Sequence, residues 1–242
     1  MSDASTPMSS TVTAERDGPV LVIRLDDGKA NVITHDVLRA IHAQLDAVER
    51  DDDICAVVIA GRPRQFSGGF DLKEFAKGAE ATRDLVIAGA ELCNRLYVYP
   101  KVTVTAVTGH AVAAGAIITM ACDWNVGADG PFRMGLPETA IGMALPIFAI
   151  ELARARVHPS YVTRATILGE MFDPAGALAA GYLDQVVAAD ETESTAIARA
   201  HQLSALNSGA VRHTKRATRK AVHDHVAATL VDDVTSMTTG LA

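Results

Sequence analysis

Apolar residues fall into short runs that predict a series of buried strands. Five runs of apolar or β-branched residues have this composition, and they cover residues 20–25, 54–60, 102–107, 124–127 and 182–187. A weaker alternating run over residues 11–15 precedes the first of them. Because Asp17-Gly18 is a strong turn signal, the two runs beside it are expected to pair as a β-hairpin.

Helical spacing of apolar residues predicts helices between these strands. One face of a helix over residues 35–50 carries Val37, Leu38, Ile41, Leu45 and Val48. A second helix, over residues 81–97, ends before Pro100. Further helical patterns cover residues 113–121, 145–156, 160–169, 174–180 and 191–242. Strand, strand and helix recur at intervals of tens of residues, which favours coiled layers over one flat sheet.

Composition narrows the class of protein. Hydrophobic residues make up 49% of the chain and charged residues 21%, an ordinary globular balance. The formal net charge of −7 argues against a nucleic-acid or anionic-membrane surface. Three cysteines in apolar surroundings fit free thiols better than a disulfide framework. No run reaches the roughly 18 consecutive apolar residues of a membrane span. Residues 1–10 lack the charged-then-apolar order of a secretory signal peptide. We therefore expect a flexible N-terminus and a cytoplasmic protein.

Candidate chemistry concentrates in residues 108–142. A strand leads there into Ala113-Ala114-Gly115 and then into a helix, an arrangement that bares backbone N–H groups for a developing negative charge. A second stretch, Phe66-Ser67-Gly68-Gly69-Phe70, contains glycines that let the backbone turn an N–H inward. By composition alone Glu138 is a surface charge. In an apolar pocket its pKa would rise, which suits a general acid and base.

Three stretches together resemble the crotonase superfamily, the enoyl-CoA hydratase/isomerase family. They are Gly28-Lys29-Ala30-Asn31, the FSGGFDLK sequence of residues 66–73, and residues 108–142, in the family's order and spacing. Residues 172–187 resemble the region that follows the core. The resemblance implies an α/β fold with a crotonase-like coiled ββα spiral core over residues 11–188. It also implies a C-terminal helical oligomerisation region over residues 189–242.

The resemblance also implies roles for individual residues. The backbone N–H groups of Phe70 and Ala114 would hold a thioester enolate, and Glu138 would be the catalytic acid and base. Contacts with CoA are implied for Lys29, Ala30, Ser67, Gly68, Phe70, Asp71 and Leu72. The implied acyl pocket includes Ala113, Ile117 and Leu145. Acyl-CoA is thus the expected small-molecule partner and substrate, with no metal and no other cofactor, in a homotrimer or hexamer.

The sequence departs from the hydratase pattern at residue 117. Typical hydratases carry a glutamate there and a second one at the position of Glu138, and the pair activates water. Ile117 cannot bind or deprotonate water, so one carboxylate remains. We therefore predict an isomerase that moves the double bond of an enoyl-CoA in fatty-acid β-oxidation. The alternatives are a hydratase that uses Glu138 alone and a non-catalytic acyl-CoA binding protein.

Several other polar residues have a structural interpretation. Asp71 is expected to cap a helix and Asp123 to close a turn. His110 is expected to line the core or the pocket rather than act as a base. A basic stretch contains His213, Lys215, Arg216, Arg219 and Lys220, and we interpret it as a solvated face, with a CoA contact from a neighbouring subunit as the alternative. The apolar stripe of Val226, Leu230 and Val234 is expected to pack on the core or to mediate assembly.

Overall fold

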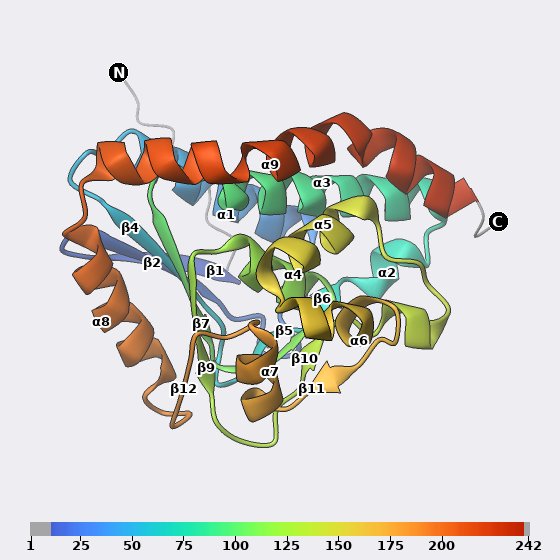
Figure 1. The fold of residues 1–242 in the computed structure, drawn as a ribbon, viewed down its shortest axis with the longest axis horizontal. Helices are drawn as coiled ribbons and strands as arrows, with labels where there is room; N and C mark the ends of the chain where they lie inside the picture. The colour runs from blue at the N-terminus through green and yellow to red at the C-terminus, as the bar shows by residue number, and fades with distance from the viewer. Residues whose placement is uncertain (1–10, 240–242) are drawn as a thin grey trace.

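A six-stranded sheet forms one side of the fold (Figure 1). The computed structural model describes residues 11–239, and this sheet has the order β1-β2-β4-β7-β9-β12. Its strands are β1 (Val12–Asp17), β2 (Val20–Leu25), β4 (Ala56–Ala60), β7 (Val102–Val107), β9 (Trp124–Ala128) and β12 (Gln185–Val187). The predicted hairpin is confirmed, because β1 and β2 are antiparallel with Asp17 opposite Val20. The other neighbouring strands are parallel.

A second sheet, as expected of coiled layers, lies beside the first, although the sequence analysis predicted none of its strands individually. It has four strands in the order β11-β10-β8-β5, and a separate pair joins β3 to β6. The strands are β5 (Arg64–Ser67), β8 (Gly109–Val112), β10 (Met134–Gly135), β11 (Met171–Phe172), β3 (Val32–Ile33) and β6 (Gly69–Phe70). The chain passes from β7 in the first sheet to β8 in the second and then into a helix. This passage is the coiled ββα unit of the predicted crotonase fold.

Helices pack around both sheets. They are α1 (His35–Glu49), α2 (Leu72–Phe75), α3 (Ala79–Tyr97), α4 (Ala114–Ala121), α5 (Ile147–Arg156), α6 (Val162–Thr166), α7 (Pro174–Ala180), α8 (Thr192–Ser204) and α9 (Ser208–Thr239). Two short 3-10 helices are η1 (Glu138–Ile141) and η2 (Pro159–Tyr161). The helix predicted over residues 160–169 is therefore shorter than expected, because Gly169 takes a positive φ of 60° and ends the segment.

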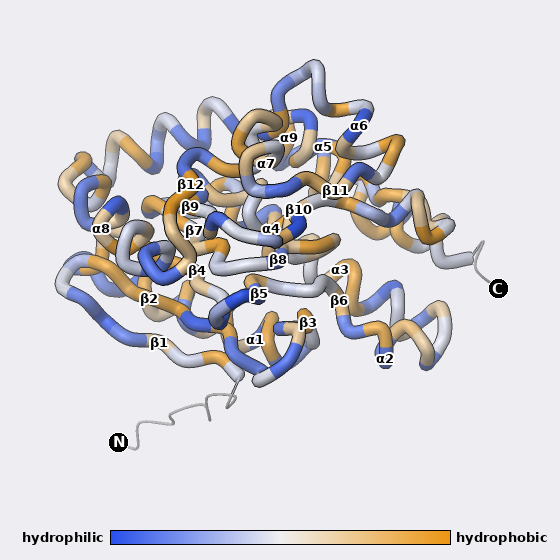
Figure 2. The backbone as a smooth tube through the Cα atoms, turned by 90° about the horizontal axis from the view of Figure 1, so that it is seen from below, coloured by the Kyte–Doolittle hydropathy of each residue, from blue (hydrophilic) through white to orange (hydrophobic). Residues whose placement is uncertain are grey.

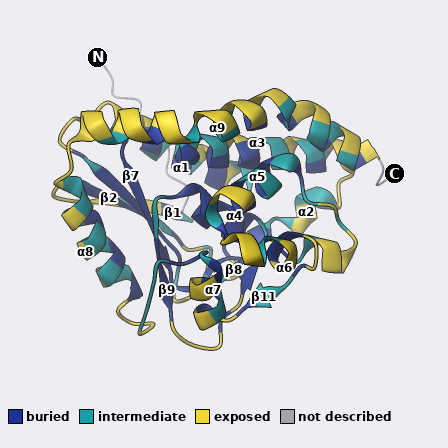
Figure 3. Cartoon of the chain, in the orientation of Figure 1, coloured by how far each residue is buried: buried dark blue, intermediate teal, exposed yellow. Residues whose placement is uncertain are grey.

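The two faces of the six-stranded sheet belong to different apolar layers. Along β2 and β4, Ile23 and Val57 face the main core, and Val22 and Val58 face a smaller cluster that α8 covers with Ala196. This alternation follows from the two-residue period of a strand. In Figure 3 the central strands β2 and β7 are buried and the outer faces of α8 and α9 are exposed.

The C-terminal helix α9 runs along α3 and α5 of its own chain (Figure 1). Its apolar stripe is consumed by this packing, since Val226, Leu230 and Val234 are all buried. Hydrophobic and hydrophilic residues alternate along the helix in Figure 2, as expected when one face lies on the protein. No helix within residues 11–239 combines the length and apolar character needed to cross a membrane.

Part of the basic stretch of α9 anchors the helix. Lys215 is only 8% exposed, and its ammonium lies 2.5 Å from Asp123 Oδ2. The Arg219 guanidinium lies 2.9 Å from Asp123 Oδ1. The interpretation of the basic stretch as a solvated face is therefore wrong for these two residues. The predicted flexible segment, residues 1–10, falls outside the described residues.

Candidate active site

The first part of the site is the beginning of α4. Ala113 precedes this helix with φ 51° and ψ −122°, and its N–H donates to the carbonyl oxygen of Gly135 at 3.0 Å. The first intrahelical bonds include that from the Ile117 N–H to Ala113 O, also at 3.0 Å. Helical geometry gives the N–H of Ala114, the first residue of α4, no acceptor within the helix. The helix dipole adds partial positive charge at this end.

Glycine at position 115 lets α4 begin close to β5. A Cβ atom at Gly115 would lie 2.6 Å from the carbonyl oxygen of Ser67. Any larger residue would push the start of the helix away from the strand that leads to Phe70. Glycine at position 115 thus permits a close approach of two backbone segments, a role that the sequence analysis did not assign to it.

The second part of the site is the backbone at Phe70. The N–H of Asp71, the residue that follows β6, donates to Ile33 O at 3.1 Å. Because successive amides of a strand point to opposite sides, the Phe70 N–H points away from β3. Gly69 makes this geometry accessible with φ 96°. A Cβ atom at Gly69 would lie 3.5 Å from the Ala114 nitrogen, so the two N–H groups belong to adjoining segments.

Hydrogen bonds fasten the predicted CoA-contacting loop to this backbone. Ser67 Oγ donates to Asn31 O at 2.7 Å, and Gly68 N–H donates to Ala30 O at 2.8 Å. The amide of Asn31 donates to Leu25 O at 2.7 Å, which holds the loop at the end of β2. Ser67 is fully buried, whereas the side chain of Lys29 is exposed. The CoA contacts themselves stay a prediction.

Glu138 supplies the carboxylate of the site. It begins η1 immediately after Pro137, and its carbonyl oxygen accepts from the Met143 N–H at 2.9 Å. Oε2 of Glu138 is buried without a hydrogen-bond partner among the described residues. Burial raises the pKa of the Glu138 carboxyl to about 7, against an opposing backbone hydrogen bond. The predicted direction of the pKa shift is therefore confirmed.

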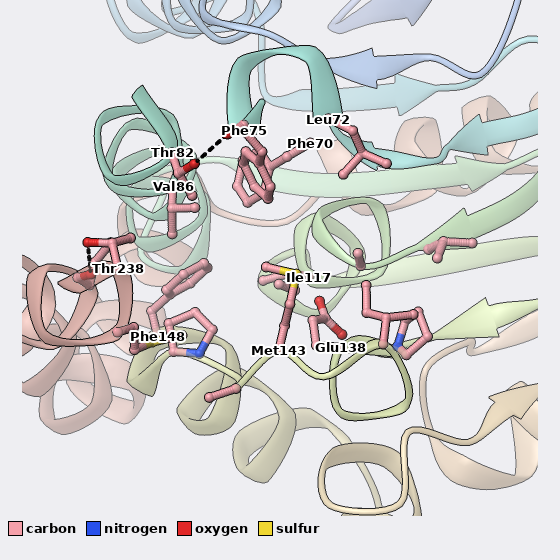
Figure 4. Close-up of a pocket in the computed structure, with 18 of the residues that line it drawn as sticks. Phe70, Leu72, Phe75, Thr82, Val86, Ile117, Glu138, Met143, Phe148 and Thr238 are labelled. Atoms are coloured by element: carbon pink, nitrogen blue, oxygen red, sulfur yellow. Dashed lines mark hydrogen bonds between the residues drawn. The ribbon is translucent and has the colours of Figure 1, made fainter. Parts of the chain in front are cut away.

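A pocket of about 190 Å³ joins these parts (Figure 4). It is lined by Gly68, Phe70, Leu72, Phe75, Thr82, Val86, Val112, Ala113, Ile117, Pro137, Glu138, Ile141, Met143, Ala144, Pro146, Phe148, Val234, Met237 and Thr238. Glu138 is the one ionisable side chain among these lining residues. In Figure 4 its carboxylate lies beside Ile117 and Met143. The site therefore holds a single acid in an otherwise apolar cavity.

The structure places half of the predicted site residues in the lining of the pocket. Gly68, Phe70, Leu72, Ala113 and Ile117 line it together with Glu138. The predicted residues that do not line it are Lys29, Ala30, Ser67, Asp71, Ala114 and Leu145. The half-buried side chain of Leu145 packs against the main core, while its neighbours Ala144 and Pro146 form the wall.

Sequence reasoning missed the far wall of the pocket. Thr82 and Val86 of α3, and Val234 and Thr238 of α9, each lie four residues apart and so occupy one face of their helix. The spacing was visible in the sequence, but it is equally typical of residues that only fill a core. Nothing in the sequence joins two faces that are separated by more than 100 residues.

The other polar candidates have structural contacts. Asp71 caps α2 by accepting from the Lys73 N–H at 3.0 Å, and Asp123 accepts from the Thr103 N–H at 2.8 Å. His110 Nδ1 accepts from the Arg133 N–H at 3.1 Å and does not line the pocket. Within residues 11–239 no group of three or more His, Cys, Asp or Glu side chains could hold a metal ion.

Comparisons with known proteins identify the family of this chain. The enoyl-CoA hydratase/isomerase family matches residues 15–239. Human mitochondrial enoyl-CoA delta isomerase 1 is 32% identical over 205 residues, covering 84% of this chain and 68% of the relative. A solved enoyl-CoA hydratase/isomerase family protein from Pseudomonas syringae is 41% identical with a TM-score of 0.92, covering 96% of this chain and all of that one.

A third relative carries the other activity in its name. A solved enoyl-CoA hydratase from Mycobacterium marinum is 37% identical with a TM-score of 0.89, and the match covers 95% of this chain and 100% of that chain. Relatives called isomerase and relatives called hydratase thus share one architecture with this chain. The chain belongs to the enoyl-CoA hydratase/isomerase family, within the crotonase superfamily, and is an enzyme of isomerase or hydratase type.

Proposed function

We propose that the protein isomerises 3-enoyl-CoA thioesters to 2-enoyl-CoA thioesters with Glu138 as its single acid and base. The observation that carries this proposal is the presence of one carboxylate, and no second acid, in the apolar pocket beside the Phe70 and Ala114 backbone. A relative named enoyl-CoA delta isomerase supports the same reaction class.

The reaction begins with proton removal from C2 of the substrate. The Glu138 carboxylate takes this proton, and the electron pair of the C–H bond moves toward the thioester oxygen to give an extended enolate. The N–H groups of Phe70 and Ala114 donate hydrogen bonds to that oxygen. Each such donor contributes on the order of 3 kcal/mol in the transition state, because it is aimed where the charge develops.

The reaction ends with proton return at C4. The protonated Glu138 gives up the same proton, the enolate collapses, and the double bond moves from C3–C4 to C2–C3. Both steps need a group that is readily protonated and readily deprotonated. A Glu138 pKa of about 7 meets this requirement near neutral pH.

Ile117 argues against water addition. Its apolar side chain is 2% exposed and lines the pocket at the position of the hydratases' first glutamate. A nucleophilic water needs a hydrogen-bond acceptor that can orient and deprotonate it. Glu138 would have to supply both functions alone, so hydration is the weaker candidate.

Parallel assays of 3-hexenoyl-CoA and 2-hexenoyl-CoA test the proposal. We expect the 3-enoyl substrate to gain the absorbance of a conjugated thioester and the 2-enoyl substrate to take up water slowly or not at all. Glu138→Gln should lower isomerisation about 10²–10⁴-fold with little change in the Kd for hexanoyl-CoA. Faster hydration than isomerisation would favour the hydratase, and binding without either reaction would favour the binding protein.

A further inference from the structure

Ala113 has a backbone conformation that only glycine adopts without penalty. Its φ of 51° and ψ of −122° lie outside the regions allowed for residues with a Cβ atom. Among residues 11–239 only Asn31, Arg64 and Ala113 have a positive φ without being glycine. Asparagine often tolerates this region, but alanine has no side-chain hydrogen bond to offset the strain.

Burial of the Ala113 methyl group in the core does not offset this strain. Residue 113 is half-buried, and its side chain lines the active-site pocket. Facing it is Gly69, where a Cβ atom would come within 3.0 Å of the Ala113 Cβ. The methyl group therefore occupies space in the pocket that glycine at both positions would leave open.

The position of this methyl group relates it to one substrate atom. Ala113 directly precedes Ala114, and Gly69 directly precedes Phe70, so the methyl lies between the two segments that carry the N–H donors. A thioester oxygen held by those donors would be the oxygen on C1, and C2 is bonded to C1. An acyl group bound in this way would bring C2 close to the part of the wall that includes Ala113.

We propose that the Ala113 methyl group determines specificity by excluding acyl-CoA thioesters that are branched at C2. This inference rests on the proposed function, because it uses the same oxyanion site to place the acyl group. A substituent at C2 would compete with the methyl group for the same space. An additional methyl in an apolar pocket typically changes discrimination by about 10–200-fold.

Calorimetry with three saturated ligands tests this role. For the wild-type protein, 2-methylbutanoyl-CoA should bind at least ~10-fold more weakly than butanoyl-CoA. In the Ala113→Gly variant, the ratio of the Kd for 2-methylbutanoyl-CoA to the Kd for butanoyl-CoA should fall to below about 3, because the methyl group that discriminates between the two ligands is absent. The ratio for 3-methylbutanoyl-CoA, which is branched one carbon further on, should not change. An unchanged 2-methyl ratio in the variant would overturn the inference.

The result separates this inference from the proposed function. If the wild-type protein does not bind butanoyl-CoA at all, the proposed function fails. If it binds butanoyl-CoA and the 2-methyl ratio is the same in both proteins, only the role of Ala113 fails.

Thermal unfolding without ligand tests the strain independently. Ala113→Gly should raise Tm by about 2 °C, because relief of strain exceeds the added flexibility of the unfolded chain. Ala116→Gly is the control, since Ala116 is buried in α4, the helix that Ala113 precedes, and has no positive φ. It should lower Tm by a similar or larger amount. A fall in Tm for both variants would contradict a strained Ala113.

Discussion

At the scale of single residues, the raised pKa of Glu138 suits acid and base catalysis but lowers the stability of the fold. An ordinary glutamate has a pKa of about 4.5, whereas burial raises that of Glu138 to about 7. Between these values the unfolded chain releases the proton and the folded chain retains it. Stability is therefore lost as pH rises from about 4.5 to 7, by up to about 3 kcal/mol.

Glu138→Gln should remove this dependence on pH. At pH 8 we expect the variant to have a free energy of unfolding about 3 kcal/mol higher than the wild type, and at pH 4.5 nearly the same value. Urea unfolding at the two pH values measures the difference. Glu80→Gln serves as control, because the Glu80 side chain is 86% exposed and should give less than about 0.5 kcal/mol at either pH. Equal effects of Glu138→Gln at both pH values would contradict the raised pKa.

Ile117→Glu should create the acid pair that the pocket lacks. The new carboxylate would face Glu138 across the pocket and raise the pKa of Glu138 further by like-charge repulsion. Isomerisation should then require a higher pH, and hydration of 2-hexenoyl-CoA should appear or increase. We expect a loss in stability of at least about 2 kcal/mol, because a polar group replaces a buried apolar one.

Ile117→Gln provides the comparison for this variant. It has the size and polarity of glutamate without the charge. The glutamine variant should lose about as much stability as the glutamate variant. It should neither shift the pH profile of isomerisation nor hydrate the 2-enoyl substrate. Hydration by the glutamine variant at the rate of the glutamate variant would show that charge at position 117 is not what water addition needs.

At the scale of elements, the buried ion pairs that hold α9 contribute more to stability than its exposed ion pairs. Asp123 holds both Lys215 and Arg219, and its own side chain is 18% exposed. Burial lowers the pKa of Lys215, and Asp123 opposes that effect. Removing the carboxylate would leave the buried Lys215 ammonium with the carbonyl oxygen of Lys101 as an acceptor but without a counter-charge.

Asp123→Asn should therefore lower the free energy of unfolding by about 3–5 kcal/mol. Asp224→Asn is its control, because Asp224 also pairs with a lysine of α9, Lys220, but at the surface, where both side chains are more than half exposed. That change should cost less than about 1 kcal/mol. Chemical denaturation of both variants at pH 7 gives the comparison. Equal losses would mean that the Asp123 cluster is no more than a surface ion pair.

The elements that the sequence predicts are those with enough residues to show a period. All six strands of the first sheet were predicted, because most are five or six residues long. The strands of the second sheet were missed, because strands such as β10 (Met134–Gly135) have only two residues and form by long-range pairing with β8 and β11. A pattern of period two cannot appear in so short a segment.

The same limit separates the predicted residues of the candidate site from the missed ones. Its motif-bearing residues, Phe70, Ala113 and Glu138, lie in or beside local strand-to-helix turns and were predicted. Its far wall, which Thr82 and Val86 of α3 form with Val234 and Thr238 of α9, depends on the packing of two helices that are far apart in the sequence. Sequence spacing reports neighbours along an element, and it does not report which distant elements meet.

At the scale of the whole molecule, α9 closes the pocket of its own chain. Val234 and Met237 line the cavity, and the helix packs along α3 and α5. The stripe that suggested assembly is thus used within the chain. Self-association would therefore have to use other surfaces, and exposed apolar side chains such as Ile167 and Leu168, each about two-thirds exposed, show that such surfaces remain.

We expect the protein to form a trimer or hexamer in solution, as its resemblance to the family implies. Light scattering at micromolar concentration should give three or six times the mass of the 25.4 kDa chain. Because association stabilises the folded chain by mass action, Tm should also rise with protein concentration. A mass of one chain together with a Tm independent of concentration would establish a monomer. In that case the pocket, which within residues 11–239 is lined by one chain, would have to function without a neighbour.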